Sequence, residues 1–377
     1  MPTPPDGTAP AEFATPAAAS TRAAAAAPLV RKRTLLALAF GFAFVLWATA
    51  AGFGAGVFSA AITAALLPLP VYIALALWLD RFEPEPKAML AMAFLWGGSV
   101  AILLAGFANA SMDRVIGERM SAIATAPLFE ETLKALILLR FYSRKKTEFD
   151  GPVDGLIYAA MVGLGFAFVE NVDYYGRALA KGGSMGLAMT FTLRGVMGPF
   201  SHPLFTSLTG LGLGIARVTR RRWVRWTAPW LGFVLAVALH ATWNAGASMG
   251  CVFLAVYAGV MVPAMLGLLV VAGVSLKAEG RVIRAFLGDE RDRGILSDAE
   301  FKTLGSVRGR LRASLHALFR HGWRAERRRR AFHRAASELA FHRRRVANGE
   351  EPYSEQIETD FTNRLQACHE AEAARHA

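Results

Sequence analysis

Cysteine is scarce in this chain, with only Cys251 and Cys368 among 377 residues. So few thiols exclude a disulfide framework as the source of its stability. Charged residues are also depleted, at 19% of the chain, whereas 54% of the residues are hydrophobic. An ordinary soluble domain carries about 25% charged residues. The composition therefore points away from a soluble globular protein.

The apolar residues that are present come in long blocks, separated by short polar or basic loops. Eight blocks have about 18 or more nearly uncharged residues, which is long enough to cross a bilayer. They cover residues 34–55, 60–79, 88–110, 120–140, 154–175, 199–216, 228–249 and 253–275. The predicted fold class is therefore all-α, a polytopic integral membrane bundle of about eight transmembrane helices in a lipid bilayer.

Basic residues predict the orientation of these spans. With eight spans and a cytoplasmic N-terminus, the inner segments before the tail carry about fifteen Lys and Arg residues and the outer loops about five. Residues 183–198 are apolar but short, and they contain Arg194. A ninth span there would place the Arg220–Arg222 cluster outside. We therefore expect eight spans, a multi-pass protein of the cell membrane, and both termini in the cytoplasm, with 183–198 re-entrant or interfacial.

Three parts are predicted along the chain. Residues 1–30 are rich in Ala and Pro and are expected to be disordered, 31–276 form the transmembrane domain, and 277–377 form a basic helical tail in the cytoplasm. Ser297 and Glu300 predict a capping box in that tail. The net charge of +13 lies in loops and tail, which fits anionic lipid better than nucleic acid. The tail is then solvated, lipid-bound or a regulatory docking segment.

Ionisable residues lie inside several of the apolar blocks, where each charge costs at least about 2.5–3.5 kcal/mol. The fourth predicted span contains Glu130, Glu131 and Lys134. Glu130 and Lys134 are four residues apart, so they share a helix face and can pair. Glu170 lies near the outer end of the fifth span and His202 near that of the sixth. A structural ion pair with Lys134 explains one carboxylate but not the second.

The seventh predicted span carries His240 and Asn244, four residues apart and thus on one face. At about 1.5 Å of rise per residue, Glu130 and His240 lie near the middle of the membrane, and Glu170 and His202 lie in its outer half. Polar groups from four helices therefore share a depth range. This agreement predicts a single water-filled site rather than scattered structural pairs.

Three classes of function are compatible with such a site. A carboxylate beside histidines can act as general base towards water, and a His with an Asn can donate hydrogen bonds to an oxyanion. The same Glu and His side chains could ligate zinc, although no HExxH motif is present. A proton-coupled membrane transporter also uses intramembrane Glu and His, but no internal repeat favours it. A non-enzymatic membrane scaffold is the third class.

Four motifs on separate spans, in order, carry a family resemblance. They are Glu130-Glu131-x-x-Lys134, Phe166-x-x-x-Glu170-Asn171, the segment around His202, and His240-x-x-x-Asn244. This set resembles the PrsW family of intramembrane proteases, which is distantly similar to the CAAX prenyl-proteases, over roughly residues 35–275. The resemblance implies a glutamic-type or metal-dependent endopeptidase that cleaves a membrane-anchored protein near the outer face, in the best-known case an anti-sigma factor.

The resemblance also implies residue roles. Glu130 is then the main catalytic carboxylate, and Lys134 holds its geometry. The supporting residues are Glu131 and Glu170 for water activation, His240 and Asn244 for the oxyanion, and His202 as a second base or a ligand. The CAAX relatives have a His where this chain has Glu170. No cofactor is certain, zinc is left open, and neither the substrate nor the oligomeric state follows from the sequence.

Overall fold

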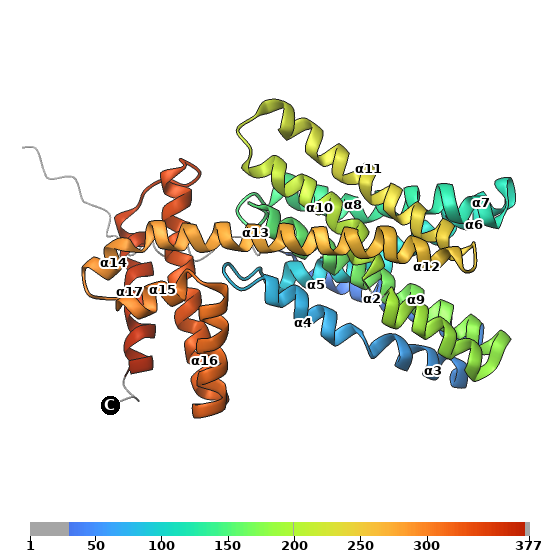
Figure 1. Ribbon diagram of the computed structural model, residues 1–377, viewed down its shortest axis with the longest axis horizontal. Helices are drawn as coiled ribbons and strands as arrows, with labels where there is room; N and C mark the ends of the chain where they lie inside the picture. The colour runs from blue at the N-terminus through green and yellow to red at the C-terminus, as the bar shows by residue number, and fades with distance from the viewer. Residues whose placement is uncertain (1–29, 199, 374–377) are drawn as a thin grey trace, which may run out of the picture.

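The computed structural model describes residues 30–198 and 200–373. The segment 1–30, predicted to be disordered, lies outside the described residues except for Val30. Within the described ranges the chain forms helices and no strand, as the all-α prediction requires. Figure 1 shows a bundle of long helices with a smaller group of helices at one end, and α13 reaching from one to the other.

The bundle consists of α-helices interrupted by short π-helical turns. Their bounds are α2 Lys32–Phe53, α3 Ala55–Leu66, α4 Leu69–Leu79, α5 Lys87–Trp96, η1 Gly97–Ala101, α6 Ile102–Ile116, α7 Glu118–Met120, η2 Ser121–Thr125, α8 Ala126–Arg144, α9 Pro152–Phe191, η3 Thr192–Met197, α10 Ser201–Val218, α11 Arg222–Ala247, α12 Val252–Val256, η4 Tyr257–Met261 and α13 Val262–Phe286. Each of the eight predicted spans overlaps one or more of these helices.

Six helical runs in the described part of the chain are long and apolar enough to cross a membrane. They are Lys32–Phe53, Ala55–Leu79, Lys87–Ile116, Pro152–Val218, Arg222–Ala247 and Val252–Phe286. The run Pro152–Val218 contains two predicted spans, the fifth and the sixth. α8 overlaps the fourth but is not among the six, because charged side chains interrupt its apolar sequence. The predicted polytopic membrane bundle is confirmed.

α9 and the chain that follows it form one long antiparallel hairpin. Gly183 has a φ of 60°, a left-handed conformation that favours glycine, and the chain reverses there. A Cβ on Gly186 would lie 2.5 Å from the carbonyl oxygen of Ala178, so the two arms touch directly beyond the turn. Residues 184–197 thus fold back along α9, and α10 continues the same arm. This agrees with the expectation that residues 183–198 do not form a ninth span.

Farther along the hairpin, glycines allow the two backbones to meet. A Cβ on Gly210 would lie 2.0 Å from the carbonyl oxygen of Gly155. Gly210→Leu should therefore force the arms apart and lower the free energy of unfolding by about 1–3 kcal/mol or more. Equilibrium unfolding in detergent micelles measures this loss. Gly267→Leu, where no atom lies within 4 Å of an added Cβ, should be neutral, and equal stability of both variants would contradict the close contact.

The C-terminal helices form a packed unit docked onto the bundle. They are α14 Gly288–Asp292, α15 Asp298–Leu304, α16 Val307–Ala347 and α17 Glu355–Ala373. The predicted capping box is present, since Ser297 Oγ accepts a hydrogen bond from the Glu300 backbone. Arg345 Nη1 lies 2.9 Å from Glu83 Oε1 in the loop after α4. The domain boundary predicted after residue 276 falls inside α13, and these contacts favour docking over a solvated tail.

Candidate active site

α8 places two carboxylates and one ammonium in the middle of the bundle. The side chains of Glu130, Glu131 and Lys134 are buried. Lys134 Nζ lies 2.9 Å from Glu131 Oε1 and 3.4 Å from Glu130 Oε2, as the spacing of three and four residues along a helix allows. The same Nζ lies 3.8 Å from the centre of the Phe166 ring. Lys134 therefore balances both carboxylates at once.

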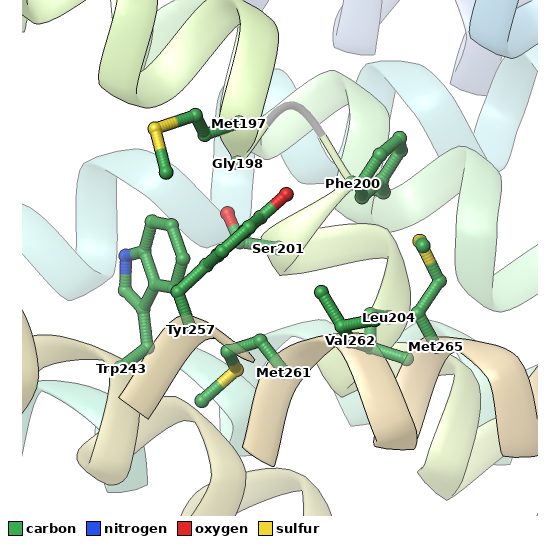
Figure 2. Close-up of a pocket in the computed structure, with 10 residues that line it drawn as sticks. All are labelled: Met197, Gly198, Phe200, Ser201, Leu204, Trp243, Tyr257, Met261, Val262 and Met265. Atoms are coloured by element: carbon green, nitrogen blue, oxygen red, sulfur yellow. The ribbon is translucent and has the colours of Figure 1, made fainter. Parts of the chain in front are cut away.

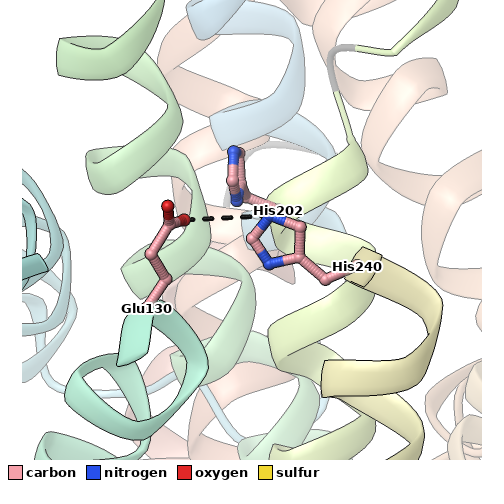
Figure 3. Close-up of side chains that lie close together, drawn as sticks. All are labelled: Glu130, His202 and His240. Carbon is pink, nitrogen blue, oxygen red and sulfur yellow. Dashed lines mark ion pairs between the residues drawn. The ribbon is translucent and has the colours of Figure 1, made fainter. Parts of the chain in front are cut away.

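α11 adds His240 to this group. His240 Nδ1 lies 3.1 Å from Glu131 Oε1, and its Nε2 lies 3.8 Å from Glu130 Oε2. Thr206 Oγ1 on α10 donates to Glu131 Oε2 at 2.9 Å. Figure 3 shows Glu130 and His240 facing each other, joined by a dashed line, with His202 beside them. Glu131 is thus held through both oxygens, whereas Glu130 is held more loosely.

His202, in the first turn of α10, connects α8 to α9. His202 Nδ1 lies 2.9 Å from Lys134 Nζ, and its Nε2 lies 2.7 Å from Glu170 Oε2. An ammonium can only donate, so Nδ1 accepts and Nε2 carries the proton that is donated to Glu170. This assigns the neutral tautomer of His202 with its proton on Nε2. The contacts form an unbroken polar chain from Glu170 to Glu130.

Arg194 completes the site, and the sequence analysis assigned it only to an outer segment. Its guanidinium pairs with Glu170 and donates through Nε to Asn171 Oδ1 at 2.7 Å. The antiparallel register of the α9 hairpin brings residue 194 beside residue 170. The cluster then contains three carboxylates and two fixed cations, because Arg194 joins Lys134. An isolated Arg in a short apolar segment was the signal that could have predicted this.

Two asparagines make hydrogen bonds that the sequence analysis did not predict. Asn109 Nδ2 on α6 donates to Glu130 Oε1 at 3.2 Å, a contact that the sequence analysis missed. Asn244, predicted to bind the oxyanion, donates instead to the carbonyl oxygen of Ala122 in η2 at 2.8 Å. Of the six predicted site residues, the structure brings together Glu130, Glu131, Glu170, His202 and His240. It does not bring Asn244 to the carboxylates.

Comparison with known proteins identifies the family of this chain. The model of the PrsW family intramembrane metalloprotease matches residues 85–270, which include every residue of the cluster. Protease PrsW of Geobacillus kaustophilus (strain HTA426) is 31% identical over 169 residues, 44% of this chain and 69% of the relative. Protease PrsW of Oceanobacillus iheyensis is 30% identical over 162 residues, 42% of this chain and 70% of the relative.

The chain belongs to the PrsW family. Its members are intramembrane metalloproteases, so this PrsW-family protein is a membrane-embedded endopeptidase acting among membrane proteins and lipid. The transporter alternative is not favoured. No solved structure matches the chain. The matched range ends before α14, so the C-terminal helices lie beyond it.

The donor set of this PrsW-family protein fits a catalytic metal. Glu130, His202 and His240 each offer a ligand atom, and these atoms lie within 4.8 Å of one another. Each histidine binds a carboxylate through its other nitrogen, His240 to Glu131 and His202 to Glu170. Metal-ligating histidines typically have this partner. Three protein ligands with an open position are typical of catalytic zinc. In the structure Lys134 Nζ donates to the other nitrogen of His202, Nδ1, so Lys134 would have to release this atom for His202 to bind a metal.

An apolar pocket lies beside the cluster of the PrsW-family protein. Figure 2 shows its walls, which come from the chain around Gly198, from α10, from α11 and from the helix that begins at Val262. Ser201 is adjacent to His202 in the chain, and Trp243 follows His240 by about one helical turn. Met261 and Met265 also line it. The pocket therefore lies next to the helical turns that carry the two histidines, and its walls are mostly apolar.

Proposed function

We propose that the buried cluster hydrolyses a peptide bond of a membrane-anchored protein, with Glu130 as the general base towards water. The observation that carries this proposal is the meeting of Glu130 with His240 and His202 from three separate helices inside an apolar bundle. A carboxylate next to imidazoles in a protected site is the arrangement that general-base hydrolysis needs. An anti-sigma factor as the substrate stays a prediction from the resemblance.

Glu130 suits the base better than Glu131 does. Both oxygens of Glu131 are engaged, by Lys134 and His240 on one side and by Thr206 on the other. Glu130 has longer contacts, 3.2 Å to Asn109 and 3.4 Å to Lys134. A loosely held carboxylate can take a proton from water with less loss of existing hydrogen bonds. Glu131 then orients His240 and Lys134, and Glu170 orients His202.

The tautomer of His240 limits its role. An ionised Glu131 only accepts, so His240 Nδ1 carries the proton and a neutral His240 presents a bare Nε2 towards Glu130. Stabilising an oxyanion from Nε2 would require the doubly protonated ring. A bare Nε2 suits a metal ligand. If Glu130, His202 and His240 held a metal, it would polarise the scissile carbonyl or the attacking water, and Glu130 would then act as a ligand instead of as the general base. Asn244 donates a hydrogen bond to the backbone of η2 instead, so it takes no part in this step.

The test uses the purified protein in proteoliposomes with a membrane-anchored reporter protein. We expect cleavage near the outer face, because Glu170 and His202 lie in the predicted outer half. Loss with a chelator and recovery with zinc would support the metal-dependent form, whereas chelator-resistant cleavage would support the glutamic form. Proton-coupled solute flux without proteolysis would contradict the proposal.

We also infer, from the bias of basic residues, that the protein lies in the cell membrane with both termini in the cytoplasm.

Arg194 gives a sharper check on the arrangement. Arg194→Gln removes the guanidinium that pairs with Glu170. The Glu170 carboxylate then competes with Glu130 and Glu131 for the donors His202 and Lys134. We expect cleavage to slow by about 10–100-fold, the range seen when a residue that orients a site's ligands is lost. Arg194→Lys should restore part of the rate. Arg177→Gln, at an exposed ion pair with Asp173, is the control, and equal rates for both Gln variants would contradict a role for Arg194.

A further inference from the structure

α16 is a helical hairpin whose first arm leaves several large apolar side chains exposed. Its turn is at Gly322, where φ is 80°. The arm before the turn exposes Leu311, Leu315 and Phe319, which recur about one helical turn apart. Phe319 is 81% exposed, and Trp323 beyond the turn is 60% exposed. By contrast, the second arm buries its apolar residues in the C-terminal unit.

The same segment is basic along its whole length. Between Ser306 and Glu326 the sequence contains no acidic residue. Its arginines include Arg308, Arg312, Arg320 and Arg324, all exposed. A helix with an apolar stripe and an arginine-rich polar face is typical of segments that lie in the interface of a bilayer. Each basic residue near an anionic lipid surface adds attraction.

The arm begins at the level where the membrane surface is expected. Arg81 follows the span Ala55–Leu79, and its guanidinium lies 3.8 Å from the centre of the Trp78 ring. Trp and Arg residues at the end of a span mark the interface of a bilayer with water. Arg81 Nη1 donates to the carbonyl oxygen of Val307, the first residue of α16, at 3.3 Å. The first turn of α16 is therefore at interfacial depth.

The direction of the arm completes the geometry. α13 runs without a break from the bundle into the C-terminal unit, and Figure 1 shows α16 running across α13 rather than along it. A Cβ on Gly280 would lie 2.6 Å from the carbonyl oxygen of Gly305, so α13 and the start of α16 touch closely. Gly280 lies only about one helical turn beyond Leu276, where the apolar part of α13 ends and Lys277 follows. An element that runs across a membrane-spanning helix at this level runs along the membrane surface.

We propose that residues 307–325 lie in the headgroup layer of an anionic phospholipid bilayer, on the side of the membrane where α13 ends. Leu311, Leu315, Phe319 and Trp323 insert among the acyl chains, and the arginines bind lipid phosphates. This contact holds the C-terminal unit at the membrane surface, in addition to the Arg345–Glu83 ion pair that joins the unit to the bundle. It is independent of the chemistry at Glu130.

Depth-dependent quenching in nanodiscs tests this with the full chain. The Cys251→Ser/Cys368→Ser protein receives a single Cys at Phe319, labelled with an environment-sensitive fluorophore. A matched label at Tyr353, which is 68% exposed between α16 and α17, is the control. In nanodiscs whose anionic lipids carry brominated acyl chains, we expect loss of most of the fluorescence at 319 and little loss at 353. With zwitterionic brominated lipids, quenching at 319 should weaken clearly.

A charge variant adds a second measurement. Arg312→Glu/Arg320→Glu/Arg324→Glu should abolish quenching at 319 in anionic nanodiscs, while unchanged cleavage shows that the bundle is folded. The lipid comparison with the unaltered arginines stands even if this variant does not fold. Unquenched fluorescence at 319 in anionic nanodiscs would overturn the proposal, as would equal quenching in both lipids. Energy transfer between labelled copies without bromine quenching would identify a protein interface instead.

Discussion

Glu130→Gln is expected to lower the rate of peptide-bond cleavage by about 10²–10⁴-fold, the usual contribution of a positioned general base. Gln keeps the shape of the side chain, but its single carbonyl oxygen can accept from only one of Asn109 and Lys134, which bind different oxygens of Glu130. It also cannot take a proton from water. It also loses the negative charge that a metal ligand would supply. Single-turnover cleavage of a reporter protein in proteoliposomes measures the loss directly.

The control for this experiment is Glu118→Gln. Glu118 is an exposed carboxylate on α7, only twelve residues earlier in the chain, and its replacement should leave cleavage at the wild-type rate. Unfolding curves of the two variants should be compared, so that lost activity is not mistaken for lost structure. A Glu130→Gln protein that cleaves as fast as wild type would remove Glu130 from the mechanism, even though the family assignment would stand.

Lys134→Met should have the largest effect on stability. The substitution leaves Glu130 and Glu131 buried without their cation and leaves His202 Nδ1 without its donor. Removing one partner of a buried ion pair costs about 3–5 kcal/mol, because the remaining charge is unpaired in a medium of low polarity. We therefore expect a loss of this size in equilibrium unfolding in detergent micelles.

A double variant separates charge from packing in this prediction. Glu131→Gln/Lys134→Met removes the carboxylate closest to the missing ammonium and should recover part of the loss, with a coupling of about 0.5–3 kcal/mol between the two positions. Lys302→Met, at an exposed site on α15, is the control for a surface lysine. If the double variant is less stable than Lys134→Met alone, the ion pair is not what stabilises this part of the bundle.

Much of the fold could be predicted from the sequence because lipid imposes a simple rule. A backbone that crosses a bilayer must satisfy its own hydrogen bonds, so long apolar runs become helices. The predicted ranges accordingly overlap the helices of the structure. The observed helix boundaries differ from the predicted ones at some turns. The fifth span was predicted to end at residue 175, but α9 extends to Phe191 across the turn at Gly183. Hydropathy does not register a turn made by glycine inside an apolar segment.

The candidate site was predictable to a similar extent, and for a similar reason. A charged side chain inside an apolar helix is costly, so each such residue stands out in the sequence. Glu130, Glu170 and His240 were found in this way. Thr206 and Asn109 were not, since neutral polar residues are cheaper in a span and give a weaker signal. Asn244 matched a motif, but its amide points to the backbone of η2.

The sequence by itself determined that this chain forms a helical membrane protein and that charged groups belong inside it, because composition and hydropathy act residue by residue. Only the tertiary structure decided which charges meet. Arg194 reaches Glu170 through the register of the hairpin, which depends on backbones that approach at Gly155 and Gly210. The pairing of Lys134 with His202 depends on how α8 packs against α10. Such contacts join residues far apart in the chain, and their geometry is set by the packing of several helices together.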